Sequence, residues 1–314
     1  MESPPLPLDR IGQRFSIRLH EPDGGYRDVV GFLNSSNSVI NRHGTEIIFD
    51  PNQIFIWREI LERKATAGKG APLTLRVFEL DQICNATWPA PEQLEENDWL
   101  LRAAGGITNR ANSIQPLAAA LKSDKPNDFA NKLESAQKFY RARNLPTIFQ
   151  LALPTWQGLY EDLTSVGAVE TIRGNTMVSD LVPVKVNLPS GFEIIENAQV
   201  TEQWSEVHPT PGIETIISGC PATYLYISNG AKAVACVRIA LWQSWSSITR
   251  VYVKREFRGT GLGKAIVSAA LNKSLSQGAT KAVLQVEATN AVAIGIYESL
   301  GFNFHHEYVY LELR

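Results

Sequence analysis

The segment from Arg258 to Lys264 combines the residue types that bind phosphate groups. Arg258, Gly261 and Gly263 form the pattern Arg-x-x-Gly-x-Gly between an apolar stretch and a predicted helix. Glycines lack the Cβ atoms that would keep backbone N–H groups away from a ligand, and a helix N-terminus carries partial positive charge. The side chain of Arg258 can complete an anion clamp. We therefore predict a pyrophosphate site in this segment.

Two common nucleotide-binding motifs do not fit these glycines. A P-loop requires a glycine at the position of Arg258 and a Ser or Thr at the position of Ala265. A dinucleotide-binding fingerprint that starts at Gly259 requires its third glycine at the position of Lys264. The alternative to a phosphate site is a tight turn that needs glycines only for its backbone conformation.

A second set of residues lies near the C-terminus, after an apolar stretch that predicts a strand. Asn290 is placed to cap a helix, and Tyr297 lies two turns later on nearly the same face, with the small Ala293 between them. Such a face leaves room for a slender ligand alongside the helix. Gly301 is placed as a C-terminal cap, so ordinary helix punctuation is the alternative interpretation.

In this order and context, the two motifs resemble the signature of the GNAT superfamily of N-acetyltransferases, an Arg/Gln-x-x-Gly-x-Gly/Ala loop followed by Asn, Ala, Tyr and Gly-Phe. The resemblance covers residues 184–314. It implies an α/β (α+β) GNAT fold, with a mixed, mostly antiparallel sheet flanked by helices, and acetyl-CoA as the donor. The cofactor-binding residues that it implies are Val251, Tyr252, Val253, Arg258, Gly259, Thr260, Gly261, Leu262, Gly263, Lys264 and Asn290.

The resemblance also implies how the donor reacts. The backbone of residues 251–253 holds the pantetheine arm and the acetyl carbonyl, and residues 259–264 cradle the pyrophosphate. A preorganised N–H group near Val253 stabilises the charge that develops on the thioester oxygen. Tyr297 returns a proton to the CoA thiolate, whose pKa lies near the roughly 8.5 of a free thiol. Core packing is the alternative role of Tyr297.

The attacking amine must lose a proton, so carboxylates on the strand before Asn290 are candidate general bases. Some relatives carry a Glu where this chain has Gln285, and Glu287 lies two residues later on the same strand face. Glu287 either takes the proton through water or caps the following helix together with Thr289.

Candidate acceptor contacts lie elsewhere in the sequence. Arg110, Asn112 and Ser113 can recognise a carboxylate or an amide, because arginine binds carboxylates in a bidentate geometry. A plain turn after the Gly105-Gly106 pair explains the same residues. Three further residues are left unassigned between an acceptor pocket and ordinary packing: Trp242, Trp245 and Arg250.

Turn signals and composition predict the elements that position these residues. Residues 8–62 alternate strand-forming segments with turns and predict a small SH3-like β-barrel. Residues 63–75 are small and polar and predict a linker. Residues 76–183 mix helical and strand patterns, and residues 184–314 form the catalytic domain, with antiparallel strands expected over 222–253.

A weak internal similarity links the second and third regions. Residues 148–151 precede 159–163 and Gly167 much as residues 283–286 precede 296–300 and Gly301. We infer a duplication in which the two lobes share a fold. The whole arrangement resembles an actinobacterial subgroup with an SH3-like barrel, a degenerate lobe and an active lobe, and residues 99–106 and 110–113 resemble that subgroup's middle region.

Charge and composition exclude several classes of protein. The 314 residues include 30 Lys+Arg and 32 Asp+Glu, a net charge of −2, which argues against a protein that mainly binds nucleic acid or anionic lipid. The three cysteines and five histidines show no metal-ligand spacing, so neither a metal nor a disulfide framework is expected. No signal peptide or membrane span is evident, and we expect a soluble, cytoplasmic protein.

The sequence therefore predicts an acetyl-CoA-dependent N-acetyltransferase that acts on a primary amine by direct attack. The partners that the resemblance implies are acetyl-CoA and a small-molecule amine, and the resembling subgroup points to the α-amino group of an amino acid such as glutamate. A protein-lysine (histone-like) acetyltransferase is one alternative. A non-catalytic acyl-CoA-binding regulator that docks a partner through its barrel is another, although the presence of both Arg258 and Tyr297 favours catalysis. The oligomeric state is not predicted.

Overall fold

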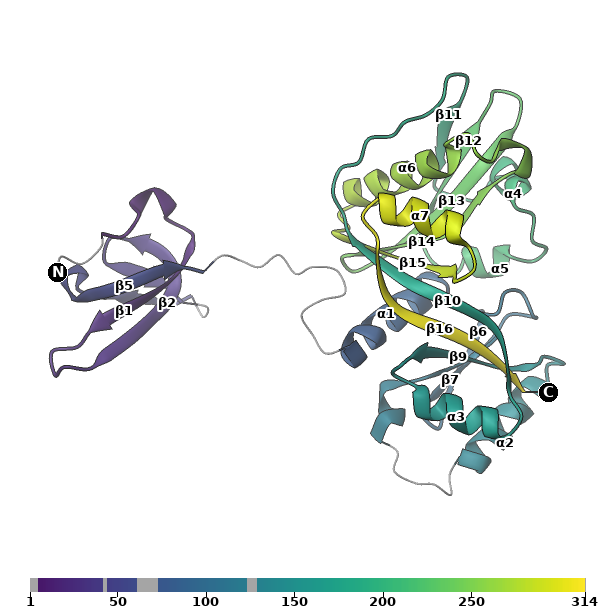
Figure 1. The fold of residues 1–314 in the computed structure, drawn as a ribbon, viewed down its shortest axis with the longest axis horizontal. Coiled ribbons are helices and arrows are strands. Elements are labelled where there is room, and N and C mark those ends of the chain that lie inside the picture. Colours follow the sequence, from purple (N-terminus) through teal and green to yellow (C-terminus); the bar gives the residue numbers. More distant parts are fainter. Residues whose placement is uncertain (1–4, 42–43, 61–72, 123–128, 314) are drawn as a thin grey trace. The chain divides into compact units, whose positions relative to one another are not determined.

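The computed structural model describes residues 5–41, 44–60, 73–122 and 129–313. The chain divides into two compact units, Met1–Ala65 and Thr66–Arg314 (Figure 1). The predicted linker, residues 63–75, spans this division, and its part before Leu73 lies outside the described residues.

The first unit is a five-stranded antiparallel sheet in the order β4-β3-β2-β1-β5. Phe15, Ile17 and Leu19 alternate along β1 and are fully buried in a small core, because successive side chains of a strand point to opposite faces. Closure into an SH3-like barrel over residues 8–62 stays a prediction. The strands are β1 (Arg14–His20), β2 (Tyr26–Ser35), β3 (Ser38–Ile40), β4 (Glu46–Ile48) and β5 (Ile54–Glu59), with short 3-10 helices η1 (Leu8–Arg10) and η2 (Pro51–Gln53).

The second unit is built on one eleven-stranded sheet in the order β11-β12-β13-β14-β15-β10-β16-β9-β8-β7-β6. Elements of its first half are α1 (Leu73–Thr87), β6 (Glu92–Glu96), β7 (Trp99–Ala103), β8 (Ile114–Pro116), η3 (Ala118–Lys122), α2 (Phe129–Arg141), β9 (Thr147–Leu153), α3 (Gln157–Ser165) and β10 (Val169–Asp180). Elements of its second half are β11 (Glu193–Asn197), α4 (Glu202–Val207), α5 (Glu214–Ile217), β12 (Ala222–Ser228), β13 (Ala233–Trp242), β14 (Trp245–Val253), η5 (Arg255–Phe257), α6 (Leu262–Ser276), β15 (Lys281–Glu287), α7 (Ala291–Ser299) and β16 (Asn303–Leu313).

The two halves repeat the same order of elements. In the first, β7 and β8 form an antiparallel pair, α2 leads to β9, which is parallel to β8, and α3 leads to β10. In the second, β13 and β14 form an antiparallel pair, α6 leads to β15, which is parallel to β14, and α7 leads to β16. This repetition supports the duplication inferred from the sequence.

The halves exchange their last strands. β10, which ends the first half, lies between β15 and β16, and β16 pairs with β10 and β9. Figure 1 shows these two long strands side by side at the centre of the unit. The continuous sheet therefore crosses the boundary predicted at residues 183/184, and the division into two lobes describes the order of elements, not separate compact bodies.

Helices cover both faces of the second half of the sheet. Ala282, Leu284 and Val286 of β15 face the core formed with α6 and α7. Val283 points the other way and packs against α1. By the same alternation, Gln285 and Glu287 lie on the α1 face of β15. The antiparallel strands expected over residues 222–253 are β12, β13 and β14.

Candidate active site

Strands β14 and β15 pair where they begin and separate toward their carboxyl ends. Their parallel pairing joins residues 245–247 to residues 281–283 and stops there. β14 continues to Val253 paired only with β13, and β15 continues to Glu287 paired only with β10. Backbone groups that point into the resulting gap have no strand partner, so they are available to a ligand.

A β-bulge lies in β14 beside this gap. Thr249 pairs with Arg238 and Tyr252 with Cys236, so Arg250 and Val251 together oppose a single residue of β13. Arg250 has a φ of 56°, in the left-handed region that side chains other than glycine rarely adopt. Bulges re-aim the residues that follow them, and here those residues line the gap.

The Arg250 side chain fastens a loop of the second half to the bulge. Its guanidinium donates to Thr210 Oγ1 at 3.0 Å and to the His208 carbonyl oxygen. The His208 ring stacks on Tyr252 with the ring centroids 4.2 Å apart. Burial, and after it the charge of Arg250, lowers the pKa of His208 to about 4, so this histidine is neutral at physiological pH.

A pocket of about 550 Å³, which we call the donor pocket, opens between the end of β14, the start of α6 and α7. Residues 251–253 form one wall, and Phe257, Arg258 and the following glycines form the next. The remaining walls come from Val267 of α6 and from Asn290, Val292, Ala293, Ile296 and Tyr297 at α7.

The glycine-rich loop has the geometry of an anion cradle. Gly259 and Gly261 have φ values of 76° and 87°, and no atom lies within 4 Å of where their Cβ atoms would be. Gly261 precedes α6 and no side chain caps this helix, so its first N–H groups are open to a bound anion. The structure therefore fits a pyrophosphate here, and the glycines are needed both for backbone conformation and for access.

Arg258 is held at the mouth of the same loop. Its Nε donates to the Val253 carbonyl oxygen at 3.1 Å, and its guanidinium carbon lies 5.3 Å from the centre of the Tyr252 ring. The side chain is exposed and makes no ion pair among the described residues. Its charge is thus available to an anionic group in the donor pocket.

The donor pocket brings together most of the residues that the sequence assigned to cofactor binding. The lining members are Val251, Tyr252, Val253, Arg258, Gly259, Gly261, Gly263, Lys264 and Asn290. The side chains of the other two do not line it: the Thr260 hydroxyl donates to the Phe257 carbonyl oxygen, and Leu262 is buried in the core beneath the loop.

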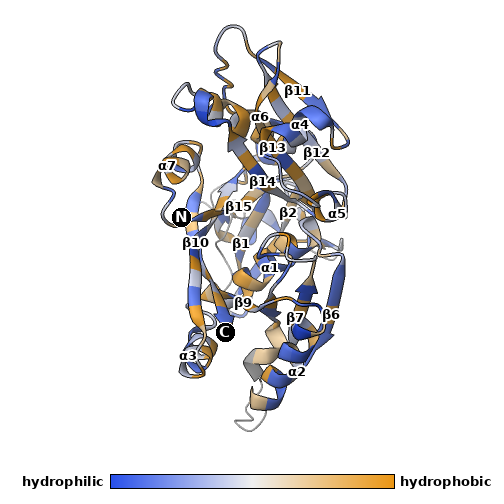
Figure 2. Cartoon of the chain, turned by 90° about the vertical axis from the view of Figure 1, so that its right-hand side faces the viewer, coloured by the Kyte–Doolittle hydropathy of each residue, from blue (hydrophilic) through white to orange (hydrophobic). Residues whose placement is uncertain are grey.

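Helix α7 carries Tyr297 into the donor pocket. Asn290 caps the helix by accepting a hydrogen bond from the Ala293 N–H at 3.2 Å. Figure 2 shows that α7 is largely hydrophobic, which suits a helix whose apolar side chains Val292 and Ile296 line a ligand pocket. Burial raises the pKa of Tyr297 to about 12, so its phenol remains protonated across the physiological range.

A second cavity, of about 250 Å³, lies beside the donor pocket, and we call it the acceptor cavity. Consecutive residues of β14 line the two cavities: Ile248, Thr249 and Arg250 line the acceptor cavity, and the next three residues line the donor pocket. Its other walls are Gln285 and Glu287 of β15, Ile172 of β10, Tyr308 and Tyr310 of β16, and Trp88, Thr108, Asn109 and Arg110 from the first half.

Glu287 projects into this acceptor cavity. Asn290, and not Glu287 with Thr289, provides the side-chain cap of α7. Gln285 lies beside Glu287 on the same strand face, and its Oε1 is buried with no hydrogen-bond partner among the described residues. The wall formed by β15 therefore offers a carboxylate and an unsatisfied amide oxygen, both acceptors for the N–H groups of an amine.

Of the other candidate acceptor contacts, only Arg110 and Arg250 line the cavity. Asn112 and Ser113 are buried, and their hydrogen bonds stay within the first half. Trp245 is buried and donates to Glu79, and Trp242 is exposed at the end of β13. Neither tryptophan lines either pocket.

Sequence reasoning missed the aromatic walls of the acceptor cavity, Trp88, Tyr308 and Tyr310. The alternation of Tyr308 and Tyr310 on one strand face was a usable signal. Among the described residues, no cluster of His, Cys, Asp or Glu could hold a metal ion, and no helix is both long and apolar enough to span a membrane.

Comparisons with known proteins agree with this geometry. Residues 74–311 match the family model described as "Probable histone acetyltransferase Rv0428c C-terminal". The chain is 26% identical over 250 residues to the "Uncharacterized N-acetyltransferase YobR" of Bacillus subtilis, covering 74% of this chain and 97% of that protein. It is 23% identical over 316 residues to the "Probable histone acetyltransferase Rv0428c" of Mycobacterium tuberculosis, covering 96% and 95% of the two chains.

Solved structures show the same fold. A GCN5-related N-acetyltransferase from Kribbella flavida superimposes with a TM-score of 0.60 at 17% identity, over 77% of this chain and 95% of that one. A tandem GNAT protein from the clavulanic acid biosynthesis pathway superimposes with a TM-score of 0.55 at 13% identity, over 79% and 89%. The glycine-rich loop and the separated strands agree with the family match. This chain therefore belongs to the Rv0428c C-terminal family of GNAT enzymes and is an acetyl-CoA-dependent N-acetyltransferase.

Proposed function

We propose that the enzyme acetylates the primary amine of a small molecule bound in the acceptor cavity, with the α-amino group of an amino acid such as glutamate as the acceptor. The consecutive residues of β14 that line the two pockets carry this proposal. A thioester held by residues 251–253 lies next to an amine held beside Thr249 and Glu287, so direct attack needs no covalent enzyme intermediate.

The reaction needs stabilisation of the negative charge that builds on the thioester oxygen. N–H groups of β14 that point into the gap toward β15 are preorganised by the bulge at Arg250, and the region of Val253 is our candidate for this role. One such donor contributes about 3–4 kcal/mol of transition-state stabilisation.

Two protons move during the transfer. The amine attacks as the neutral base, and Glu287, directly or through water, takes the proton that the nitrogen loses. As the tetrahedral intermediate collapses, the C–S bond breaks and Tyr297 protonates the departing thiolate. The raised pKa of Tyr297, about 12, keeps the phenol protonated until this step.

Two relatives that match shorter segments of the chain suggest further acceptors to test. The chain is 28% identical over 119 residues to the "[Ribosomal protein bS18]-alanine N-acetyltransferase" of Escherichia coli and 32% identical over 99 residues to a mycothiol acetyltransferase of Corynebacterium aurimucosum. The small volume of the acceptor cavity favours a free small molecule. Acetylation of a protein lysine would contradict the proposal of a small-molecule acceptor.

The decisive experiment measures thiol release from acetyl-CoA with a panel of amino acids, polyamines and a lysine-containing peptide. We expect amino acids to accelerate release the most, and Tyr297→Phe to lower kcat by about 10²- to 10⁴-fold without a matching rise in the KM for acetyl-CoA. Acetyl-CoA binding without amine-dependent thiol release would refute catalysis. Preference for the peptide would refute the small-molecule acceptor.

A further inference from the structure

We propose that the first half of the sheet supplies the acceptor-recognition element of the active site, with Arg110 binding a carboxylate of the amine acceptor. This inference rests on the proposed function, because it concerns the same cavity. It assigns a specificity-determining residue to a part of the chain that contains neither the glycine-rich loop nor Tyr297.

The buried side chain of Asn112 stabilises the loop that carries Arg110 through hydrogen bonds to its backbone. Asn112 Oδ1 accepts hydrogen bonds from the N–H groups of Ala104 and Gly106, at 2.8 and 2.9 Å. Its Nδ2 donates to the carbonyl oxygens of Ile107 and Thr108, both at 2.8 Å. All the hydrogen-bonding capacity of this amide is spent within the loop, so Asn112 shapes it and does not contact the acceptor.

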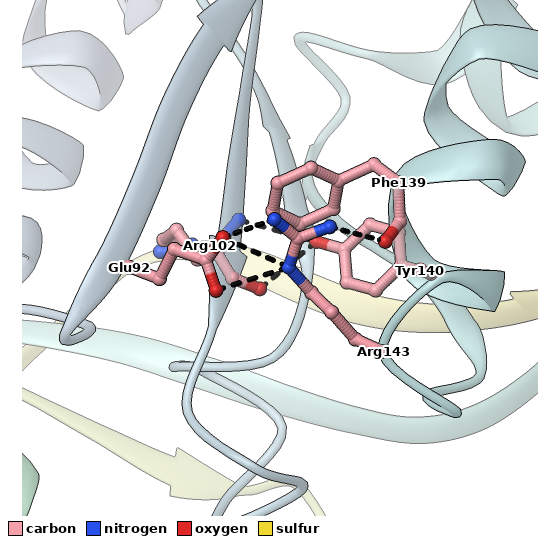
Figure 3. Close-up of polar contacts among 5 residues, drawn as sticks. All are labelled: Glu92, Arg102, Phe139, Tyr140 and Arg143. Carbon is pink, nitrogen blue, oxygen red and sulfur yellow. Dashed lines mark hydrogen bonds and ion pairs between the residues drawn. The ribbon is translucent and has the colours of Figure 1, made fainter.

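Hydrogen bonds also join the two ends of the loop. Arg102, fully buried in β7 before the loop, donates from Nε to the Ser113 carbonyl oxygen and from Nη2 to Ser113 Oγ, at 3.1 and 2.8 Å. Tyr140 of α2 bonds to both backbone groups of Arg102, and Arg143 pairs with Glu92 beside it (Figure 3). Hydrogen bonds therefore join β7, which precedes the loop, to Ser113, which follows it.

Arg110 projects from this braced loop into the acceptor cavity. Its guanidinium carbon lies 5.7 Å from the centre of the Trp88 ring, and this cation–π contact stabilises the positive charge. Its positive charge acts on both tyrosines of the cavity wall: burial raises the pKa of Tyr308 and of Tyr310, and Arg110 opposes the rise in each. Arg110 and both tyrosines line this cavity, and the Tyr310 side chain also shares a hydrogen bond with Arg110.

No carboxylate of the described residues forms an ion pair with Arg110. Arg250 differs, because its two terminal nitrogens donate to Thr210 and His208, and only its buried Nε has no hydrogen-bond partner among the described residues. An arginine that lines a partly desolvated cavity and forms no ion pair favours an anionic ligand, and the planar guanidinium suits a carboxylate.

Arg110 and Glu287 together give the cavity one cationic and one anionic wall. A molecule with an amine and a carboxylate satisfies both, with its amine beside Glu287 and the thioester, and its carboxylate beside Arg110. A simple amine or polyamine would leave the Arg110 charge uncompensated. The predicted substrate class is therefore the amino acids, recognised through their carboxylate.

The test compares matched acceptors, L-alanine with L-alaninamide and L-glutamate with its α-amide, in wild type and in Arg110→Gln. The wild type should prefer each acid over its amide by about 10- to 100-fold in kcat/KM, the range expected for a charge-assisted hydrogen-bond pair. Arg110→Gln should abolish the preference through the KM of the acid, leaving kcat and the KM for acetyl-CoA nearly unchanged. Arg110→Lys should restore part of it, and Arg141→Gln, at an exposed position of α2, should change nothing.

Asn112→Ala provides a second variant that leaves Arg110 in place but removes the loop's internal bonds, and it should weaken the same preference. Thermal-shift measurements with the same acid and amide pairs report carboxylate binding independently of turnover. An unchanged acid-to-amide ratio in Arg110→Gln, or a wild type that favours the amides, overturns the inference while acetyl transfer stands. If no amine accelerates thiol release, it is the proposed function that fails, and the thermal shifts still decide the role of Arg110.

Discussion

Gly174 of β10 leaves the space in which the ring of Tyr308 lies. Gly174 pairs with Tyr308 of β16 on one side and with Glu287 of β15 on the other. A Cβ atom on Gly174 would lie 2.3 Å from Cζ and 2.4 Å from the hydroxyl oxygen of Tyr308. The tyrosine therefore crosses over β10 toward Glu287. Burial raises its pKa, and the charges of Tyr310 and Glu287 add to this rise.

We expect Gly174→Ala to displace Tyr308 and damage the acceptor cavity. The clash involves a buried ring and not the free end of a flexible chain, so overpacking should cost about 1–3 kcal/mol of stability. Because Tyr308 lines the acceptor cavity and not the donor pocket, kcat/KM for the amine should fall while the KM for acetyl-CoA stays constant. Urea unfolding and steady-state kinetics measure the two effects.

Two controls isolate this contact. Gly158 of α3 has open space around its missing Cβ, so Gly158→Ala should leave activity intact and add up to about 1 kcal/mol of stability. The double variant Gly174→Ala with Tyr308→Ala should be no less stable than Tyr308→Ala alone, since the ring that clashes is gone. A Gly174→Ala enzyme with native stability and kinetics would show that Tyr308 does not need this space.

That the predicted cofactor-binding residues line one pocket could be predicted because they are nearly contiguous in sequence. The glycine-rich loop follows β14 after the single turn of η5, and Asn290 caps the helix that carries Tyr297, so local spacing determines their geometry. The acceptor cavity was not predictable in this way. Its walls come from Trp88, the loop at Arg110, β10, β14, β15 and β16, which meet only because β10 and β16 occupy the centre of the sheet.

Residue type alone also left the roles of two polar side chains open between acceptor binding and a plain turn. Asn112 and Ser113 stood beside Arg110 as equal candidates for acceptor binding, but both are buried and their hydrogen bonds serve the loop itself. A sequence shows which groups can form hydrogen bonds and not which are already satisfied. The exchange of β10 and β16 could not be predicted for a similar reason, because a strand's pattern of apolar residues does not determine which strand it pairs with.

We expect Arg258→Gln to weaken donor binding through the pyrophosphate. Loss of one charge-assisted contact at this exposed position should raise the KM for acetyl-CoA roughly 10-fold, with kcat little changed. S-acetylpantetheine lacks the pyrophosphate, so wild type and variant should use it equally. If the variant loses the same factor with both donors, Arg258 acts on the acyl end of the pocket instead.

Glu287→Gln should impair proton removal from the amine. The amide keeps the shape of the side chain but cannot take the proton, so kcat should fall by about 10²- to 10⁴-fold while the KM for acetyl-CoA stays constant. Glu298→Gln, an exposed carboxylate on α7 outside both pockets, is the matched control. A variant that keeps the native kcat would assign the base to another group or to water alone.

His208 should make the enzyme less stable in acid. Its pKa in the folded protein is about 4, against an ordinary value of 6.5, because burial and then Arg250 disfavour the charged ring. Between these two values the unfolded chain binds more protons than the folded one, so the free energy of unfolding should fall as the pH falls from about 6.5 toward 4. Burial likewise lowers the pKa of His305 to about 4 and that of His306 to about 3, and both act in the same direction.

His208→Phe separates the His208 contribution from the other two. Phenylalanine can keep the stacking on Tyr252, and it removes a buried Nδ1 that has no hydrogen-bond partner among the described residues. One titrating group changes the slope by at most about 1.4 kcal/mol per pH unit, and partial exposure of His208 reduces this figure. Urea unfolding between pH 5 and pH 8 should show a shallower slope for the variant and no loss of stability at pH 8. Equal slopes would mean that His208 is already protonated in the folded enzyme or gains no proton on unfolding.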